Sequence, residues 1–227
     1  MKTTSPDRSY GGRSAPERTA RRRAALVDVA ITAMSESRWR SATVASLCVE
    51  AQLNKRYFYE SFDDLDALAR AVIDDISAEV TEAAVVAYVA ALQRPQPEQA
   101  RLAVDAIIGV LGTDRRKARV LLGGAAGTAA VDARRTDAIE GLTEVLIDHA
   151  RTIHDVRLEA DSLAQTAPAF VIGGTAQAIL SWAEGALRVT REQLADDLAS
   201  LWMTLGTSAA EIARTRLEES SGSSDPV

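Results

Sequence analysis

The stretch WRSATVASLCVEAQLNKRYFYESFDDLDAL, Trp39 to Leu68, decides the fold of the N-terminal part of this chain. Its spacing predicts a short helix over 43–51 and a second one over 54–62, where Asn54 is a favourable N-cap. Only Gln52 and Leu53 separate the two helices, which leaves room for a tight turn and nothing longer. The first helix has three apolar residues on one face: Val44, Leu47 and Cys48.

The second short helix divides into two faces. Phe58 and Phe62 lie four residues apart, so we expect both to pack inward with Leu53. The remaining polar and aromatic residues are left outward or flanking: Lys55, Arg56, Tyr57, Tyr59 and Ser61. An exposed set of cations and tyrosines is typical of a surface that binds phosphates and base edges. The stretch therefore has the parts of a DNA-binding helix-turn-helix, although aromatic residues four apart are more often plain core.

The same stretch resembles the TetR family of bacterial regulators, closely over 24–72 and more loosely over the remainder. The matching positions are Trp39, Thr43-Val44, Ala51, Asn54-Lys55, Tyr59, Phe62, Asp64 and Leu68. The resemblance implies that Thr43 and Tyr59 contact phosphate. It implies further that Asn54 and Lys55 anchor the start of the recognition helix, while Arg56 and Tyr57 face the bases.

Three positions depart from the family pattern. Gln52 stands where the turn commonly has glycine, which indicates a strained or differently shaped turn. Leu65 stands where a phosphate-binding lysine is usual, among acidic neighbours, and Arg38 replaces a usual glycine. We expect the arginines between Arg18 and Arg23, Arg21 and Arg22 among them, to supply part of the missing attraction for DNA.

The charge is divided unevenly along the chain. Residues 1–61 hold eleven basic and six acidic residues, a balance of +5, while the whole chain carries a net charge of -6. The remainder is therefore acidic by eleven charges. This asymmetry favours a small polyanion-binding head on an acidic body, although a solvated basic tail would give the same numbers.

We predict an all-α protein of about nine helices, with a three-helix head and a larger ligand-binding and dimerisation body. The predicted parts are a flexible arm at 1–13, the helix-turn-helix head at 14–63, the body at 64–219 and a disordered tail at 220–227. After the connector helix that follows the head, we predict helices at 97–111, 115–122, 136–155, 163–185 and 191–216. Capping boxes are predicted at Ser14, Ser162 and Thr190.

The last two long helices are predicted to form a homodimer interface. The first offers small residues that let another helix approach closely: Ala169, Gly173, Gly174, Ala176 and Ser181. The second has an apolar stripe: Leu194, Leu198, Trp202, Leu205 and Ala209. Burial of both stripes inside one monomer is the alternative.

A small-molecule effector is expected between the helices of the body, as the resemblance implies. The candidate pocket residues, chosen by chemistry, are Tyr88, His149, Phe170, Gln177 and Trp182. Each has a simpler interpretation as core or surface. His149 and His154 lie five residues apart, so they do not share a metal-binding face of a helix, and we expect no metal and no cofactor.

The function predicted from these features is sequence-specific regulation of transcription. The partners would be a double-stranded palindromic operator, a second copy of the chain and an unidentified effector that releases a repressor from DNA. A single cysteine, Cys48, no signal segment and no apolar run long enough for a bilayer favour a cytoplasmic protein with no membrane contact. We expect no enzyme activity. A helical protein-interaction scaffold or a small-molecule binder without operator function stays as the alternative.

Overall fold

The computed structural model describes residues 14–123, 128–153 and 160–222, and every regular element in these ranges is helical. Nine α-helices and one short 3-10 turn are assigned within these ranges. Their bounds are α1 Ala15–Ser35, η1 Trp39–Ser41, α2 Val44–Glu50, α3 Lys55–Tyr59, α4 Leu65–Ala90, α5 Gln96–Thr113, α6 Arg115–Leu122, α7 Ala129–Ile153, α8 Leu163–Ala183 and α9 Arg191–Gly222. The predicted all-α class is confirmed. Within the described residues no helix is both long and apolar enough to cross a membrane.

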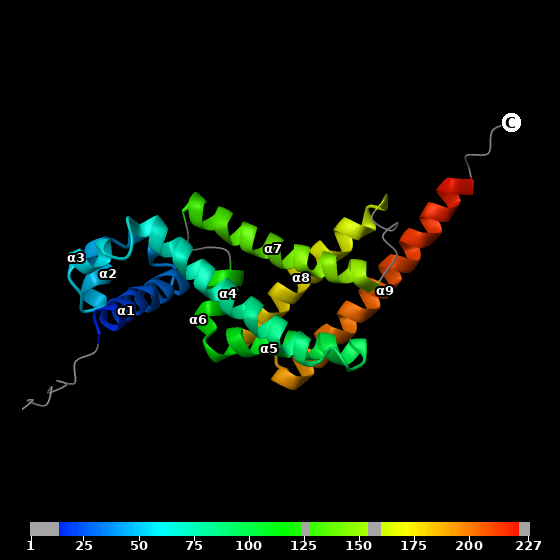
Figure 1. Cartoon of the computed structure of the whole chain (residues 1–227), viewed down its shortest axis with the longest axis horizontal. Helices are drawn as coiled ribbons and strands as arrows, with labels where there is room; N and C mark the ends of the chain where they lie inside the picture. The colour runs from blue at the N-terminus through cyan, green and yellow to red at the C-terminus, as the bar shows by residue number, and fades with distance from the viewer. Residues whose placement is uncertain (1–13, 124–127, 154–159, 223–227) are drawn as a thin grey trace, which may run out of the picture.

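The first three helices form the head, which lies at one end of the molecule (Figure 1). The predicted capping box starts α1, because Ser14 Oγ accepts from Glu17 N and the Glu17 carboxylate accepts from Ser14 N. The helix α1 packs against α2 and α3. The interior of the head is fully apolar, with Leu26, Trp39 and Leu47 each 3% exposed or less.

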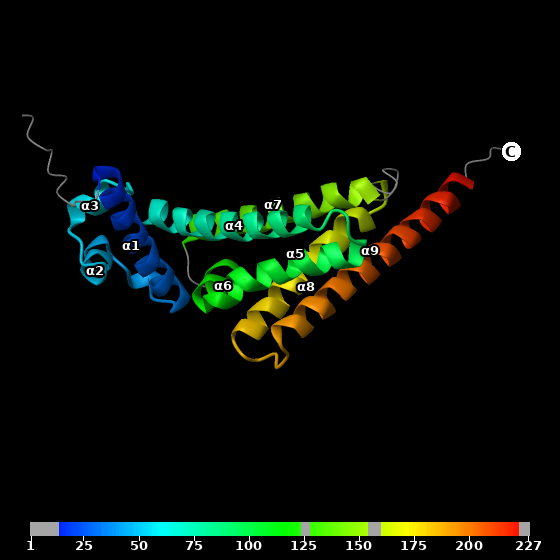
Figure 2. The same ribbon diagram turned by 60° about the horizontal axis from the view of Figure 1, so that its bottom comes forward.

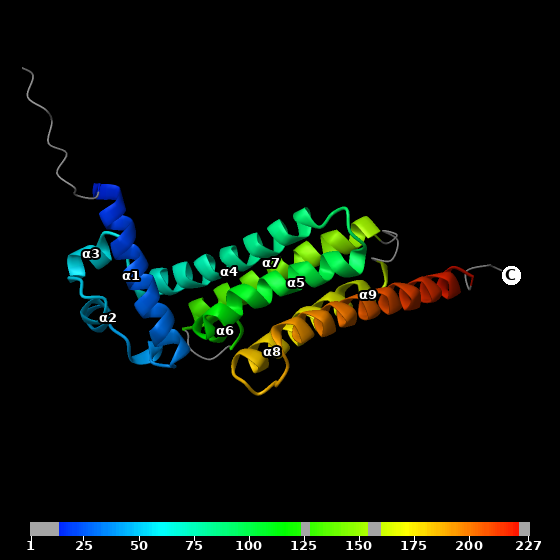
Figure 3. The same ribbon diagram turned by 90° about the horizontal axis from the view of Figure 1, so that it is seen from below.

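The other six helices form the body, in which α4 runs from the head along the molecule (Figures 1 and 2). It packs against α5 on one side and α7 on the other, and α5 packs in turn against α9. The last two helices, α8 and α9, lie side by side, and α9 extends past the ends of its neighbours (Figure 3). The short helix α6 contacts α1, α4, α5 and α8.

One continuous apolar core joins the head to the body. It runs from α1 through the buried face of α4 to α5, α6, α8 and α9. Its largest fully buried members in the body are Leu68, Ile73, Ile76, Ile108, Leu111, Leu121 and Ile179. Because the core has no break at the junction, the head packs directly against the body and is not joined to it by a linker alone.

Several predicted bounds need correction. The helix α7 begins at Ala129 instead of residue 136, because the good helix formers after Thr128 continue the helix toward the N-terminus. The helix α9 reaches Gly222, so the first residues of the stretch predicted as a disordered tail are helical. The arm at 1–13 and the last residues of the tail lie outside the described residues. Ser162 makes no capping bond, and Asp161 accepts the hydrogen bond from Leu163 N instead.

Candidate nucleic-acid interface

The two short helices at the outer end of the head begin with capping side chains. Thr43 Oγ1 accepts from Ser46 N at 3.1 Å, and Ser46 Oγ accepts from Thr43 N at 3.0 Å. Asn54 Oδ1 accepts from Tyr57 N at 3.2 Å at the start of α3. These caps fix where each helix starts. The predicted contact of Thr43 with phosphate is compatible with its capping role, because Thr43 is exposed to solvent.

The turn between α2 and α3 holds a left-handed residue. Gln52 has a φ of 55°, and its N–H donates to Val49 O at 3.1 Å. The next N–H, that of Leu53, donates to Cys48 O at 2.8 Å, which completes a Schellman end for α2. This position favours glycine, so the strain expected from Gln52 in the sequence is confirmed.

Two aromatic rings anchor α3 to the head. Phe58 is 0% exposed and Phe62 is 6% exposed, as predicted, with 5.9 Å between their ring centroids. Tyr59 meets the edge of Phe58 at a centroid distance of 5.3 Å while remaining 59% exposed itself. The anchor therefore holds the polar face of α3 toward solvent.

We call the polar and tyrosine residues of α3, the two caps and Ser61, which follows α3, the reading surface. It consists of Thr43, Asn54, Lys55, Arg56, Tyr57, Tyr59 and Ser61. Lys55, Arg56 and Tyr59 are exposed, whereas Tyr57 and Ser61 are half-buried. The Arg56 side chain is 84% exposed.

Arginines of α1 reach the same end of the head. The Arg22 guanidinium lies 4.1 Å above the Tyr57 ring centroid and 3.4 Å from Glu60 Oε2. The other carboxylate oxygen, Glu60 Oε1, accepts from Arg56 Nε at 3.1 Å. Sequence reasoning missed Glu60. Its spacing of four residues from Arg56 is visible in the sequence, whereas the contact with α1 is not.

The remaining arginines of α1 differ from one another. Arg21 is exposed, and Arg23 pairs with Asp75 of α4 at 3.0 Å.

Leu65, at the position where the family usually has a phosphate-binding lysine, is half-buried and packs on the core. Its acidic neighbour Asp66 accepts a hydrogen bond from Thr128 Oγ1 at 3.0 Å. The Asp66 carboxylate is therefore already hydrogen-bonded to a residue of the body.

Cys48 lies in the interior of the head, 2% exposed. Its burial raises the pKa of the thiol, and the nearby charge of Lys55 lowers it by less. A thiol with a raised pKa is mostly protonated and unreactive at neutral pH. The residue is a packing element of α2, as expected.

The predicted effector residues do not gather in one place. Phe170 is 67% exposed on α8, and Trp182, twelve residues along the same helix, is half-buried and donates from Nε1 to Val189 O at 3.0 Å. Twelve helical residues span roughly 18 Å. Gln177 is exposed and bonds Ser181, and Tyr88 is half-buried on α4. His149 belongs to α7, and its side chain, like the whole of His154, lies outside the described residues.

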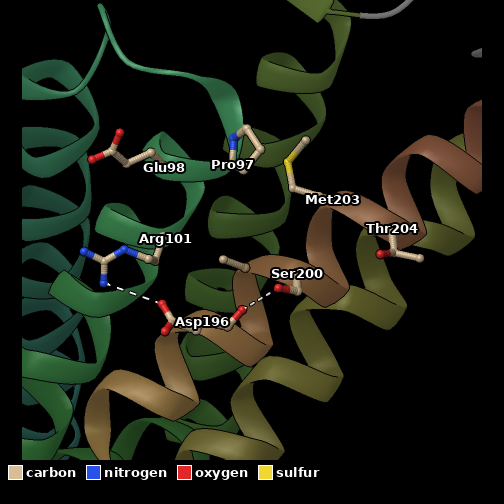
Figure 4. Close-up of a pocket in the computed structure, with 8 residues that line it drawn as sticks. Pro97, Glu98, Arg101, Asp196, Ser200, Met203 and Thr204 are labelled. Atoms are coloured by element: carbon tan, nitrogen blue, oxygen red, sulfur yellow. Dashed lines mark hydrogen bonds and ion pairs between the residues drawn. The ribbon is translucent and has the colours of Figure 1, made fainter.

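A surface hollow of about 540 Å³ lies between the start of α5 and the middle of α9 (Figure 4). Of the predicted effector residues whose side chains are described, namely Tyr88, Phe170, Gln177 and Trp182, none lines it. Its walls are Pro97, Glu98, Arg101, Asp196, Ala199, Ser200, Met203 and Thr204. Arg101 and Asp196 face each other across it, with 3.7 Å between Nη1 and Oδ1. The rest of the lining is mainly apolar, with Pro97, Ala199 and Met203 among its residues.

The predicted interface stripes have different surroundings. Leu194 and Leu198 of α9 are 2% and 5% exposed inside the chain's own core, and Trp202 Nε1 donates to Thr175 of α8 at 2.7 Å. The apolar stripe of α9 thus packs largely within the monomer, which is the alternative to the predicted dimer interface. On α8, by contrast, a second face is open to solvent and includes Ala169, Phe170, Gly173, Gly174 and Gln177.

A comparison of the whole fold with solved structures finds close likeness. A TetR-family regulator from Syntrophomonas wolfei has a TM-score of 0.68 at 12% identity, covering 83% of this chain and 96% of that one. A transcriptional regulator from Pseudomonas aeruginosa has a TM-score of 0.65 at 17% identity, covering 89% and 96%. The chain has the TetR fold.

A third neighbour with this fold is FadR from Bacillus subtilis, solved in complex with stearoyl-CoA. It has a TM-score of 0.61 at 12% identity and covers 79% of this chain and 96% of that one. The sequence itself matches no family model and no curated protein. At these identities the likeness concerns the TetR fold, and function has to be argued from the reading surface.

Proposed function

We propose that this TetR-fold protein is a sequence-specific DNA-binding regulator of transcription that works in the cytoplasm. The observation that carries the proposal is the reading surface. Lys55, Arg56 and Tyr59 are exposed on a helix that buried Phe58 and the capping side chain of Asn54 hold in place. Exposed cations and tyrosines on a rigid helix bind phosphates and base edges. Cations at the start of α3 oppose the helix dipole, and an external anion would offset that cost.

The test is selection of binding sites from a pool of randomised DNA duplexes with the full-length protein. The enriched duplex is then titrated at several salt concentrations by fluorescence anisotropy. We expect tight binding that resists a scrambled competitor. Arg56→Ala should weaken discrimination between base pairs, whereas Lys55→Ala should weaken binding to all duplexes and lower the salt slope by about one.

A matched control comes from the far end of the molecule. Arg214 is an exposed cation on α9, away from the head (Figure 1), and Arg214→Ala should leave binding and its salt dependence unchanged. The proposal would be refuted if the selection enriches no duplex and the protein binds all tested duplexes, scrambled ones included, with equal affinity. The helical scaffold would then become the better interpretation.

We also propose that the protein acts as a dimer through the open face of α8 together with α9. Phe170 is 67% exposed, Leu201 is 54% exposed and Ile212 is 46% exposed. A Cβ atom added at Gly173, Gly174 or Gly206 would meet no atom within 4 Å. Each glycine costs a helix interior about 1 kcal/mol relative to alanine, and no packing among the described residues explains that cost. Close approach of a second α8–α9 pair would explain it.

The dimer is tested by light scattering. Phe170→Asp places a charge in the proposed interface and should shift the molar mass toward that of a monomer. Val86 of α4 is 62% exposed on another helix, so Val86→Asp is the control and should remain dimeric. A dimeric Phe170→Asp variant would contradict the proposed interface.

We propose last that a ligand in the body controls DNA binding. The five predicted residues, from Tyr88 to Trp182, remain the candidates. The stearoyl-CoA bound to FadR makes a long-chain acyl-CoA a reasonable first probe. If it binds here, tryptophan emission from Trp182 and Trp202 should change and the selected duplex should dissociate. An unchanged emission together with unchanged DNA binding would exclude this class of ligand.

A further inference from the structure

One carboxylate holds two arginines at the reading surface. Glu60 is the C-cap residue of α3. Its Oε1 accepts from Arg56 Nε at 3.1 Å, and its Oε2 lies 3.4 Å from Arg22 Nη2. The arginines come from different helices, so the carboxylate fixes α1 and α3 to each other through charged hydrogen bonds.

The contact with Glu60 leaves the two terminal nitrogens of Arg56 available for binding. Only its Nε is engaged by Glu60, and neither Nη1 nor Nη2 hydrogen-bonds to the described residues. Recognition of guanine by arginine uses two parallel N–H groups on O6 and N7. With Nε tied back, both terminal nitrogens can be presented together, and fewer side-chain rotamers have to be frozen on binding.

Arg22 holds the carboxylate from the other side. Its side chain is 23% exposed, and the central carbon of its guanidinium lies over the Tyr57 ring, 4.1 Å from the ring centroid. Arg22 therefore restrains Glu60 and Tyr57 at the same time. Arg22, one of the arginines expected to supply part of the attraction for DNA, is thus engaged with two residues of the head.

The charge of Glu60 works against binding to DNA in general. A carboxylate beside the reading surface repels phosphates, and it neutralises part of the charge of the two arginines. We propose that Glu60 is a specificity-determining residue, which orients Arg56 toward a guanine edge and lowers affinity for DNA of any sequence. This proposal rests on the proposed DNA-binding function.

The test is Glu60→Gln in the full-length protein, measured against the selected duplex, its single-base-pair variants and a scrambled duplex. Glutamine has nearly the shape of glutamate and removes the charge. Affinity for the scrambled duplex should rise a few-fold. Discrimination at the base pair read by Arg56 should fall roughly 3- to 10-fold. If Glu60 had only a structural role, its replacement would lower affinity for the selected duplex and for the scrambled duplex alike. That result would overturn the proposal.

A double-mutant cycle isolates the effect on Arg56. In the Arg56→Ala background, Glu60→Gln should still raise affinity for scrambled DNA but should no longer change discrimination. Equal effects on discrimination in both backgrounds would overturn the proposal. The control is Glu36→Gln, which removes another carboxylate of the head that pairs with an arginine, Arg38, at 2.7 Å. It should leave discrimination unchanged.

The two proposals fail in different ways. If the wild-type protein does not distinguish selected from scrambled DNA, the DNA-binding function is refuted and the role of Glu60 with it. If the wild type discriminates and Glu60→Gln discriminates equally well, only the role of Glu60 is refuted.

Discussion

Replacement of Arg116 by alanine should destabilise the protein by cutting a link between body and head. Arg116 lies in the first turn of α6, and its guanidinium reaches α1. Its Nη1 donates to Thr32 Oγ1 at 2.7 Å, and its Nη2 donates to Asp28 Oδ1 at 2.9 Å. Its Nε also donates to Asp114 Oδ1 at 3.0 Å. The hydrogen bonds that Arg116 donates to the Asp114 carboxylate raise the pKa of Arg116, and the same guanidinium lowers the pKa of Asp114.

The expected loss follows from the exposure of each partner. Asp28 is 64% exposed, so its ion pair contributes at most about 1 kcal/mol. The bonds to Thr32 and Asp114 are partly buried, and each contributes about 1 kcal/mol. Asp114 keeps the backbone N–H of residue 116 as a donor, which limits the damage. The sum is about 2–3 kcal/mol, which corresponds to a fall of roughly 5–10 °C in the unfolding midpoint.

The assay is thermal unfolding followed by circular dichroism, with Arg115→Ala as the control. Arg115 is the neighbouring cation on the same helix and is exposed, so its replacement should change stability by less than about 0.5 kcal/mol. The reasoning is refuted if Arg116→Ala and Arg115→Ala unfold at the same temperature at pH 7.

The pH dependence of the same measurement tests the role of Asp114. Because the folded pKa of Asp114 is lowered, its contribution is complete above the unfolded pKa and is lost as the pH falls through the folded value. The difference between wild type and Arg116→Ala should therefore be constant from about pH 8 to 5 and should narrow below about pH 4. A difference that stays constant down to pH 3 would assign the effect to Thr32 alone.

Two backbone predictions concern glycine. Gln52→Gly should relieve the left-handed strain at φ 55° and raise stability by about 0.5–1 kcal/mol in urea unfolding; a loss of stability would show that the side chain of Gln52 matters more than its backbone. Gly112→Ala would place a Cβ atom 2.6 Å from Cζ3 of Trp182, and should cost about 1–3 kcal/mol and alter tryptophan emission. Gly141→Ala, where an added Cβ meets no atom within 4 Å, should instead stabilise by up to about 1 kcal/mol. Equal effects of the two alanines would contradict the packing.

The head could be predicted from the sequence because its signals are local. The caps at Thr43 and Asn54 and the inward pair of Phe58 and Phe62 depend on neighbours three or four residues away. The left-handed turn was predicted because Gln52 stands where the family that the sequence resembles commonly has glycine. Local geometry of this kind needs no knowledge of the rest of the fold.

Contacts between distant segments could not be predicted in the same way. Arg22 was expected on DNA, but 38 residues separate it from Glu60, and no periodicity reports that pairing. The apolar stripe of α9 was correctly identified, yet amphipathicity alone does not tell whether Leu198 meets the same chain or a second one. The predicted effector residues share only their chemistry, and chemistry does not bring Phe170 and Trp182 together.

The position of the head follows from how α6 is held. Three cationic residues of this short helix reach three different helices. Arg116 pairs with Asp28 of α1, Lys117 with Glu79 of α4, and Arg119 with Glu184 at the end of α8. The apolar residues Ala118 and Leu121 of the same helix are 0% and 1% exposed in the shared core. A movement of α8 relative to α4 must therefore break one of these pairs or carry α6, and with it α1, to a new position. Since α1 also holds the reading surface through Arg22, the orientation of α3 depends on the packing of the body.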